Sequence, residues 1–390
     1  MAYRIPHPIL GWVLKPGVSY HNRMLEATVR VSYNSKGWRD VEHAMDAPHG
    51  AFRALVLGDS FMEAYSVELN EALHQRLEEF ARQRGADLEV INLGVGGYGT
   101  LQEYLAFQEL GPLYQPQLVL LGLFIANDVR NNSFELESIV KTGTMKVESR
   151  PFLDANPPPA WRITPIDFEG AQRRYAAAQT RQNTFPQKWA SRSALVQLAV
   201  SGATRLVRML SSTVKQIAKA QPGLAEQARD LAYYGVHYCL EPAEYTRAWE
   251  STKRILARLK RDTEASGGRL FVFTVPALEE VSVAAMDRVR AHAPHPDKLC
   301  LEEATAYRRS TELLEELQID NVNLLPHFRR VMREEGTNLF RRSDSHWNPA
   351  GHALAAQLIV STLIEKNMLL LRKNDTAPQS AAEDARSSRR

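Results

Sequence analysis

The sequence is poor in cysteine, has no long hydrophobic run and carries little excess of either charge. Two cysteines among 390 residues cannot build a disulfide framework or a cysteine-rich zinc site. One bridge is possible, but we expect Cys239 and Cys300 to be ordinary buried thiols. The longest apolar runs fall far short of the roughly 20 residues that a membrane helix needs. The formal net charge of +3 is too small to indicate a nucleic-acid partner.

The N-terminus lacks the charged start and the apolar stretch of a secretory signal. We therefore expect a cytoplasmic protein, although a segment upstream of Met1 would not be visible in this sequence. Hydrophobic residues make up 44% and charged residues 24% of the chain, which is typical of a globular protein. The length allows two or three domains, or one large α/β domain with insertions.

Short apolar strands alternate with helices over most of the chain. We expect strands at 53–57, 88–93, 117–125, 269–275 and 322–325 and helices at 71–84, 101–110, 244–265, 303–317 and 349–365. Strands that are apolar on both sides indicate a parallel sheet covered by helices on both faces. Phe271 and Phe273 are expected to lie in its core.

Three regions depart from this alternation. Residues 1–50 are rich in turn signals and predict a small β extension before the main domain at 51–372. Residues 131–240 contain no strand of the core type and are interpreted as a largely helical insertion, or cap, that shapes access of substrate. Residues 373–390 show no apolar period, and we expect a disordered tail.

Within the insertion, 187–221 contains no acidic residue, and its leucines recur near helical spacing. A basic amphipathic helix can lie on an anionic membrane surface. A cap helix with a solvated basic face is the favoured alternative.

Polar and reactive residues gather where the predicted strands end. Parallel sheets place their sites beyond the carboxyl ends of their strands. Gly58-Asp59-Ser60, the loop 94–99 and Asn127-Asp128 each follow a strand directly, and Asp344-Ser345-His346 opens the last helix. We expect these four segments to meet at one edge of the sheet.

Each of these residues has an ordinary structural interpretation when it is considered alone. Ser60 could cap a helix, and Asn127 could belong to a turn. His346 could be a surface histidine, and Asp344 could help to cap the helix that begins near Pro349.

In combination, the same residues supply what acyl transfer requires: a nucleophile, a base, a group that orients the base and donors for an oxyanion. We assign Ser60 as nucleophile, His346 as base and Asp344 as its orienting group. Asp128 and a backbone carbonyl are competing orienting groups. The N–H of Ser60, an N–H of the glycine loop and the Asn127 amide would surround the oxyanion. The absence of a G-x-S-x-G motif disfavours an ordinary α/β-hydrolase.

The four segments, in this order, resemble the motif blocks of the SGNH hydrolases, also called GDSL esterases and lipases. The blocks are VLGDSF at 56–61, INLGVGGY at 91–98, Asn127-Asp128 and DSHWNPAGH at 344–352. The resemblance covers roughly 53–130 and 245–365. The stretches 10–12 and 34–40 also look like the lead-in of many bacterial members.

This resemblance implies a flavodoxin-like α/β/α sandwich with a mostly parallel sheet. It also implies a serine nucleophile at Ser60 and an oxyanion hole formed by Ser60, Gly97 and Asn127. It implies neither a cofactor nor a metal.

The last block departs from the usual Asp-x-x-His spacing, because position 343 is Ser and Asp344 lies two residues before His346. Ala126 also replaces the glycine that usually precedes the Asn-Asp pair. The Asp-x-His-Trp form is similar to SGNH-like proteins that acetylate bacterial exopolysaccharides. We therefore expect a serine esterase acting on an O-acyl group, especially O-acetyl, of a small-molecule or glycan ester. An O-acyltransferase for a bacterial polysaccharide is the main alternative.

Three other functions fit parts of the sequence. The glycines at 94–99 match G-x-G-x-x-G, but position 119, where a dinucleotide site would place an acidic residue, is Val. A metal-dependent phosphoesterase could use Asp59, Asp128, Asp344, His346 and His352 as ligands. A glycan-binding protein that has lost its activity is the third alternative, and the competent chemistry at every site position argues against it.

Overall fold

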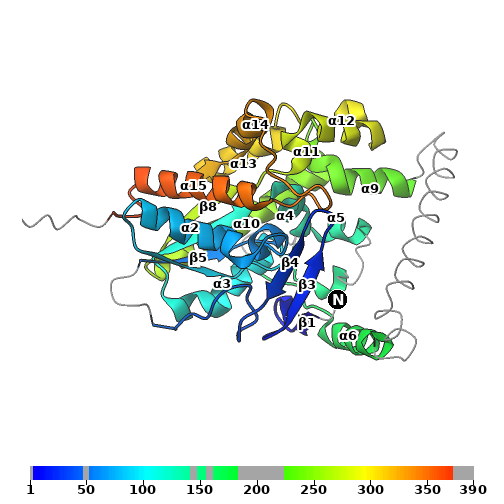
Figure 1. Cartoon of the computed structure of the whole chain (residues 1–390). Helices are drawn as coiled ribbons and strands as arrows, with labels where there is room; N and C mark the ends of the chain where they lie inside the picture. The colour runs from blue at the N-terminus through cyan, green and yellow to red at the C-terminus, as the bar shows by residue number, and fades with distance from the viewer. Residues whose placement is uncertain (1–2, 47–51, 141–146, 155–160, 183–223, 372–390) are drawn as a thin grey trace, which may run out of the picture.

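A five-stranded parallel sheet forms the centre of the protein (Figure 1). The computed structural model describes residues 3–46, 52–140, 147–154, 161–182 and 224–371. The strands are β5 (Phe52–Leu57), β6 (Leu88–Asn92), β7 (Leu118–Leu123), β8 (Arg269–Thr274) and β9 (Asp320–Asn323). They lie in the order β6-β5-β7-β8-β9. Counted along the chain, this is the 2-1-3-4-5 order of flavodoxin-like folds, which confirms the predicted fold class.

Helices cover both faces of the sheet because its strands are apolar on both sides. Helices α2 (Leu73–Gln83) and α15 (Pro349–Glu365) pack together on one face, and α3 (Thr100–Tyr114) and α10 (Ala243–Ala265) pack on the other (Figure 1). Every residue of β7 is buried, and Phe271 and Phe273 of β8 have no exposed surface. The expected core assignment of these two phenylalanines is therefore confirmed.

Shorter helices connect these layers and form the rest of the described chain. They are α1 (Ser60–Glu63), α4 (Ile125–Asn131), α5 (Phe134–Ile139), α6 (Phe168–Gln182), α9 (Leu224–Tyr234), α11 (Leu278–Val281), α12 (Val283–His292), α13 (Thr305–Glu316) and α14 (Leu325–Arg333), with single 3₁₀ turns at Leu69–Glu71, Val147–Ser149, Gly235–His237 and Pro296–Lys298. The insertion contributes α5, α6 and α9. The part of it that is basic in sequence, 187–221, lies outside the described residues, as does the tail at 373–390.

The N-terminal extension consists of two antiparallel hairpins that lie against the main domain (Figure 1). The first pairs β1 (Arg4–His7) with β2 (Gly11–Leu14), and the second pairs β3 (Ser19–Arg23) with β4 (Thr28–Ser32). The rings of Tyr3 and Tyr20 stack with their centroids 4.9 Å apart, and Tyr33 packs beside them. Because both hairpins are short, these aromatic contacts between them help to stabilise the extension.

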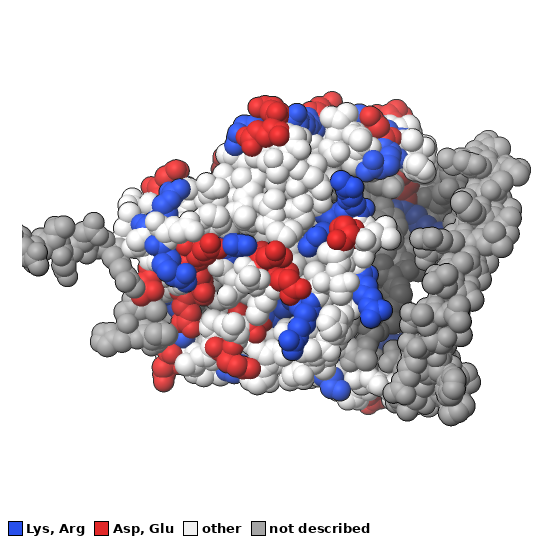
Figure 2. Space-filling model, viewed as in Figure 1, with Lys and Arg blue, Asp and Glu red and all other residues white. Residues whose placement is uncertain are grey.

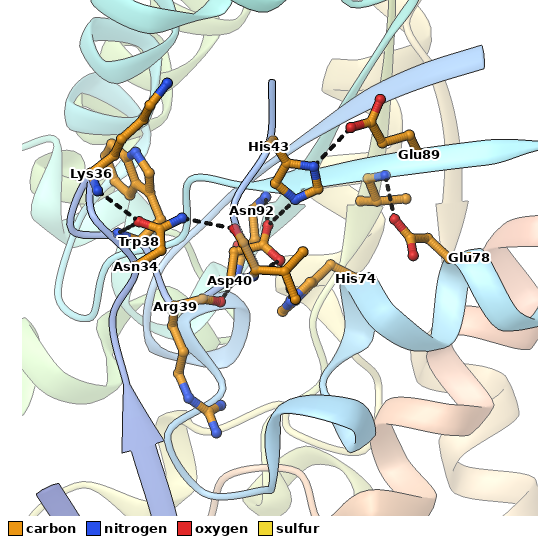
Figure 3. Close-up of polar contacts among 12 residues, drawn as sticks. Asn34, Lys36, Trp38, Arg39, Asp40, His43, His74, Glu78, Glu89 and Asn92 are labelled. Atoms are coloured by element: carbon orange, nitrogen blue, oxygen red, sulfur yellow. Dashed lines mark hydrogen bonds and ion pairs between the residues drawn. The ribbon is translucent and has the colours of Figure 1, made fainter. Parts of the chain in front are cut away.

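Residues 34–46, which we call the strap, connect the extension to the sheet and run along the edge strand β6 (Figure 3). The Asp40 carboxylate accepts a hydrogen bond from the Asn92 N–H at 2.8 Å and lies 3.2 Å from His43 Nε2. On the same edge, Glu78 of α2 accepts the Val90 N–H at 2.8 Å. Carboxylates therefore satisfy the outward backbone donors of a strand that has no neighbour on that side.

Cys239 and Cys300 form a disulfide, so the expectation of two free thiols is wrong. Tyr238 and Leu299 pair as an isolated antiparallel bridge, and the Cys239 N–H donates to the carbonyl of Lys298. In this antiparallel bridge Cys239 lies opposite Lys298 and Cys300 lies opposite His237. The two cysteines are therefore diagonal neighbours with their Cα atoms 4.9 Å apart, although 61 positions separate them in the sequence. The bridge follows from a tertiary contact that local sequence patterns do not reveal.

None of the helices in the described ranges combines the length and the apolar character that crossing a bilayer requires.

Candidate active site

The four segments chosen from the sequence meet at the carboxyl edge of the sheet. Ser60 begins α1 directly after β5, the glycine loop joins β6 to α3, Asn127 lies in α4 after β7, and His346 precedes α15. Ser60, Gly97, Asn127 and His346 are each partly exposed, whereas Asp59, Gly96, Tyr98, Asp128 and Trp347 beside them in the chain are buried. The structure thus brings together every predicted site position and leaves each one accessible to a ligand.

Ser60 and His346 are in hydrogen-bonding contact. The Nε2 atom of His346 lies 2.8 Å from the Ser60 Oγ atom. The Ser60 hydroxyl does not cap a helix, because Asp59 is the N-cap of α1 and its carboxylate accepts the N–H of Phe61 at 3.0 Å. The hydroxyl therefore has a base within reach, as nucleophilic catalysis requires.

Asp344 contacts His346 through a tight turn rather than through the extended loop that the i, i+2 spacing suggests. Ser345 has a φ of +61°, in the left-handed region, and folds the chain back. The Nδ1 atom of His346 lies 3.1 Å from the Asp344 carbonyl oxygen and 3.5 Å from its Oδ1 atom. Oδ1 also accepts the backbone N–H of His346 at 3.1 Å. Both the carboxylate and the carbonyl of Asp344 can therefore hold the imidazole.

The electrostatics of this pair favour a charged imidazole facing a charged carboxylate. Burial alone would lower the pKa of His346, but the hydrogen bond and the charge of Asp344 outweigh it and raise the pKa. Burial would raise the pKa of Asp344, and its bonds with His346 lower it instead. A carboxylate that stays ionised while the imidazole gains a proton suits the orienting role.

Of the two competing orienting groups, a backbone carbonyl does contact Nδ1, because that of Asp344 lies 3.1 Å away, whereas Asp128 has another partner. Asp344 does not cap α15, because Asn348 is the N-cap and its side chain accepts the Gly351 N–H at 3.0 Å. The Oδ2 atom of the buried Asp128 accepts the Phe124 N–H at 2.7 Å. Asp128 is thus committed to the start of α4 rather than to His346.

The side-chain amide of Asn127 is hydrogen-bonded to Asp59, the residue that precedes Ser60. Its Nδ2 atom donates to Asp59 Oδ2 at 3.0 Å. A side-chain amide carries two N–H groups, so the second remains available to a ligand. Burial raises the pKa of Asp59, although the Phe61 N–H and the Asn127 amide act in the opposite direction.

The glycine loop comes close to Ser60 because it lacks side chains. A Cβ atom on Gly96 would clash with the Arg4 guanidinium and would stand 2.8 Å from Glu63 Oε2 and 3.5 Å from Ser60 Cβ, so a larger residue would displace the Arg4 and Glu63 side chains. Gly97 has a φ of +81°, which favours glycine. Neither Ser60 N–H nor Gly97 N–H donates to another residue in the described part of the chain. Both are therefore available as oxyanion donors.

Further acidic groups lie buried behind the site. Burial raises the pKa values of Glu103 and Asp128 well above the ordinary carboxyl range, and the charges of neighbouring carboxylates add to the effect. Both oxygens of Glu103 lack a hydrogen-bond partner.

Tyr65 is a site residue that the sequence analysis did not identify. Its hydroxyl oxygen lies 3.3 Å from Nε2 and 3.4 Å from Nδ1 of His346. The hydroxyl oxygen is thus nearly equidistant from the two nitrogens, and the rings of Tyr65 and His346 lie with their centroids 5.0 Å apart and their planes inclined by 57°. Tyr65 follows Ser60 by five residues, and only that closeness in sequence could have suggested its role.

The alternative functions find little support in the geometry. In the described ranges no group of three or more His, Cys, Asp or Glu side chains is arranged to hold a metal ion. His352 is buried, with its ring 5.5 Å from that of Trp347. In a dinucleotide-binding fold the glycine-rich loop follows the first core strand along the chain, whereas here it follows the second, β6. Val119, at the position where such a site would place an acidic residue, is buried inside β7. On the face shown in Figure 2, side chains of both charges are interspersed.

A family comparison agrees with this geometry. The family model described as "SGNH hydrolase-like domain, acetyltransferase AlgX" matches residues 214–387. The match includes Asp344 and His346, and the first three motif blocks precede it. Residues 214–387 are therefore similar to an SGNH hydrolase-like domain.

Solved structures resemble this chain only distantly. An acetyl xylan esterase, AlAXEase, has a TM-score of 0.39 and 10% identity, with 80% of this chain and 98% of that chain covered. A lipase/acylhydrolase from Enterococcus faecalis has a TM-score of 0.39 and 9% identity, with coverage of 82% and 98%. A catalytic mutant of the acetylxylan esterase Axe2 from Geobacillus stearothermophilus has a TM-score of 0.39 and 11% identity, with coverage of 81% and 95%. No curated protein matches the sequence significantly.

Proposed function

We propose that this protein cleaves an O-acyl ester, specifically an O-acetyl group on a carbohydrate, through an acyl-enzyme on Ser60. The observation that carries the proposal is the 2.8 Å contact between Ser60 Oγ and His346 Nε2, with Asp344 at Nδ1. A serine with a base and an orienting group has the geometry of an activated nucleophile.

In the first half-reaction, Ser60 Oγ attacks the ester carbonyl carbon and His346 takes the hydroxyl proton. The negative charge that develops on the carbonyl oxygen faces the N–H groups of Ser60 and Gly97 and the second N–H of Asn127. The tetrahedral adduct collapses when the C–O bond to the sugar breaks, and His346 gives its proton to the leaving alcohol. The acyl group remains on Ser60.

The second half-reaction decides between a hydrolase and a transferase. Water activated by His346 would release acetate, whereas a second sugar hydroxyl would receive the acetyl group. The Asp-x-His-Trp block and the acetyltransferase description of the matching family model favour transfer. The machinery on Ser60 is the same in both cases.

The substrate and the location remain part of this proposal. The ligand is a small-molecule or glycan ester, and no cofactor, metal or nucleic acid is required. The sequence predicts a cytoplasmic protein, but disulfides persist mainly in oxidising compartments, so the Cys239–Cys300 bridge weighs against that location.

Labelling and product analysis test the proposal together. A fluorophosphonate probe should modify wild-type protein at Ser60, located by peptide mass spectrometry, and should leave Ser60→Ala unmodified. p-Nitrophenyl acetate with an oligosaccharide acceptor should then yield either free acetate or an acetylated sugar. Labelling that persists in Ser60→Ala, or activity that EDTA abolishes, would reject the serine mechanism.

A further inference from the structure

Three successive peptide groups of the glycine loop are each held by a side chain from outside the loop. Glu63 Oε2 accepts the Gly96 N–H at 2.7 Å, and the Trp12 indole donates to the Gly96 carbonyl at 3.4 Å. Arg150 donates to the Gly97 carbonyl at 2.8 Å. A glycine pair offers little resistance to rotation of its peptide plane. These bonds therefore determine the direction in which the Gly97 N–H points.

Glu63 connects the loop to the N-terminal extension. It lies at the end of α1, three residues after Ser60, and has no exposed surface. Its Oε1 atom accepts the Tyr33 hydroxyl at 2.7 Å, and the Arg4 guanidinium lies 3.6 Å from Oε2. A buried carboxylate is costly unless it is paired and hydrogen-bonded. The extension supplies the groups that keep Glu63 in place beside Gly96.

The same extension also reaches the other half of the site. Glu26, at the tip of the second hairpin, accepts the N–H of Arg342 at 2.7 Å and that of Ser343 at 3.4 Å. These residues directly precede Asp344. In the strap, Asp40 binds the Asn92 N–H, and the Asn92 side chain accepts the Gly94 N–H at 2.9 Å (Figure 3). Residues before position 47 thus contact both the oxyanion side and the base side.

We propose that Glu63 is a positioning residue for the oxyanion loop and that the N-terminal extension, through Tyr33 and Trp12, is an integral part of the active site. Oxyanion stabilisation depends on donors that are oriented before the reaction. Donation by Trp12 to the Gly96 carbonyl also polarises the peptide whose N–H belongs to Gly97. This inference rests on the proposed function, because it assigns a donor for the oxyanion of that reaction.

Kinetics of conservative variants on p-nitrophenyl acetate test the inference. Glu63→Gln should lower kcat by about tenfold or more, because a misdirected donor loses part of the 10²–10³ that one oxyanion donor supplies. KM should stay within about twofold, since the ground-state ester makes little use of that donor. Tyr33→Phe should show the same kcat-specific loss, smaller in size.

Tyr20→Phe is the matched control. It removes a hydroxyl from the same aromatic cluster, 3.4 Å from the Tyr33 hydroxyl, without touching Glu63. It should keep the wild-type kcat. If Glu63→Gln fails to fold, Trp12→Phe replaces it, because it removes the indole N–H and retains an aromatic ring.

The outcomes separate the two proposals. The positioning role of Glu63 would be overturned if Tyr33→Phe kept the wild-type kcat and if the second variant, Glu63→Gln or its replacement Trp12→Phe, kept it too. It would also be overturned if Tyr20→Phe lost as much kcat and Tm as the other variants, because equal losses would report a general effect on folding. A wild-type protein that neither reacts with the fluorophosphonate nor cleaves the ester would remove the proposed function, and the inference with it. That result is read from the wild type before any variant is made.

Discussion

The Nε2 atom of His346 lies 2.8 Å from Oγ of Ser60, although 286 positions separate the two residues in the chain. Ser60 stands at the end of the first core strand, and His346 stands before the last helix. The fold brings them together because α15 returns to pack on α2, the helix that follows Ser60 and α1 in the chain. The predictions below test what this contact and its surroundings do.

Asp344→Asn should lower kcat with little change in Tm. Loss of the orienting aspartate costs about 10⁴ in a triad, but the Asp344 carbonyl still accepts from Nδ1, so we expect a loss between tenfold and about 10⁴. The acid limb of the kcat/KM profile should move to lower pH, because the Asp344 carboxylate helps to raise the pKa of His346. An unshifted acid limb together with kcat above a tenth of wild type would remove the aspartate from this role.

Asn127→Ala should lower kcat by about 10²–10³ with KM nearly unchanged, as expected for the loss of one oxyanion donor. Steady-state kinetics on p-nitrophenyl acetate measure both constants. Asp59→Asn provides a second variant, because the Asp59 carboxylate holds the Asn127 amide at 3.0 Å. A change in KM alone would place Asn127 in ground-state binding of the ester.

His43 should stabilise the fold below about pH 9 and cease to do so above it. Burial would lower the pKa of His43, but bonds with Asp40 and Glu89 raise it to about 9. A folded pKa above the unfolded value of about 6.5 means that the contribution is complete below pH 6.5 and is lost as pH rises through 9. His74, Glu78 and Arg53 also face this network and remain in the variant (Figure 3).

The measurement is Tm between pH 6 and pH 10 for wild type and His43→Gln. The difference between the two should be largest at pH 6, should shrink between about pH 6.5 and pH 9, and should be lost above pH 9. A difference that is constant across this range would show that the charge of His43 does not contribute.

Replacing both cysteines by Ser should destabilise the protein by about 4 kcal/mol, the chain-entropy value for closing a loop of 61 residues. Urea unfolding of Cys239→Ser/Cys300→Ser, compared with wild type in reductant, measures the loss. The two samples should have the same midpoint, below that of oxidised wild type. Equal midpoints in all three samples would show that the bridge adds no stability.

The sequence predicts most of the sheet well, because β7 is a fully apolar run and β5, β6 and β8 are largely apolar. It predicts β9 less well, because that strand is mostly polar and begins two residues before the predicted 322–325. It also predicts Ser60, Gly97, Asn127 and His346 as neighbours, since parallel strands bring their carboxyl ends to one edge. The turn at Ser345 escapes such analysis, because a positive φ at a serine has no local signal and depends on the surrounding contacts.

The contacts made by the N-terminal extension are similarly hidden from the sequence. Trp12 and Asp40 lie within stretches that resemble a family lead-in, yet nothing in those stretches says which surface they contact. From the sequence, Glu63 would be interpreted as an ordinary acidic residue in the first turn of a helix. Its burial depends on a tyrosine and an arginine from hairpins that dock only in the folded protein.

Strand β6 leaves one side of the sheet without a neighbouring strand, and such an edge invites another chain to pair with it. Here the outward N–H groups of Val90 and Asn92 are already bonded to the carboxylates of Glu78 and Asp40. An incoming strand would have to displace both before it could form a ladder. Burial raises the pKa of Glu78, whereas the pKa of Asp40 is lowered because the neighbouring histidines outweigh its own burial. As the pH falls, Glu78 is therefore protonated before Asp40, and its hydrogen bond with the Val90 N–H weakens first. Edge-to-edge aggregation would begin at Val90.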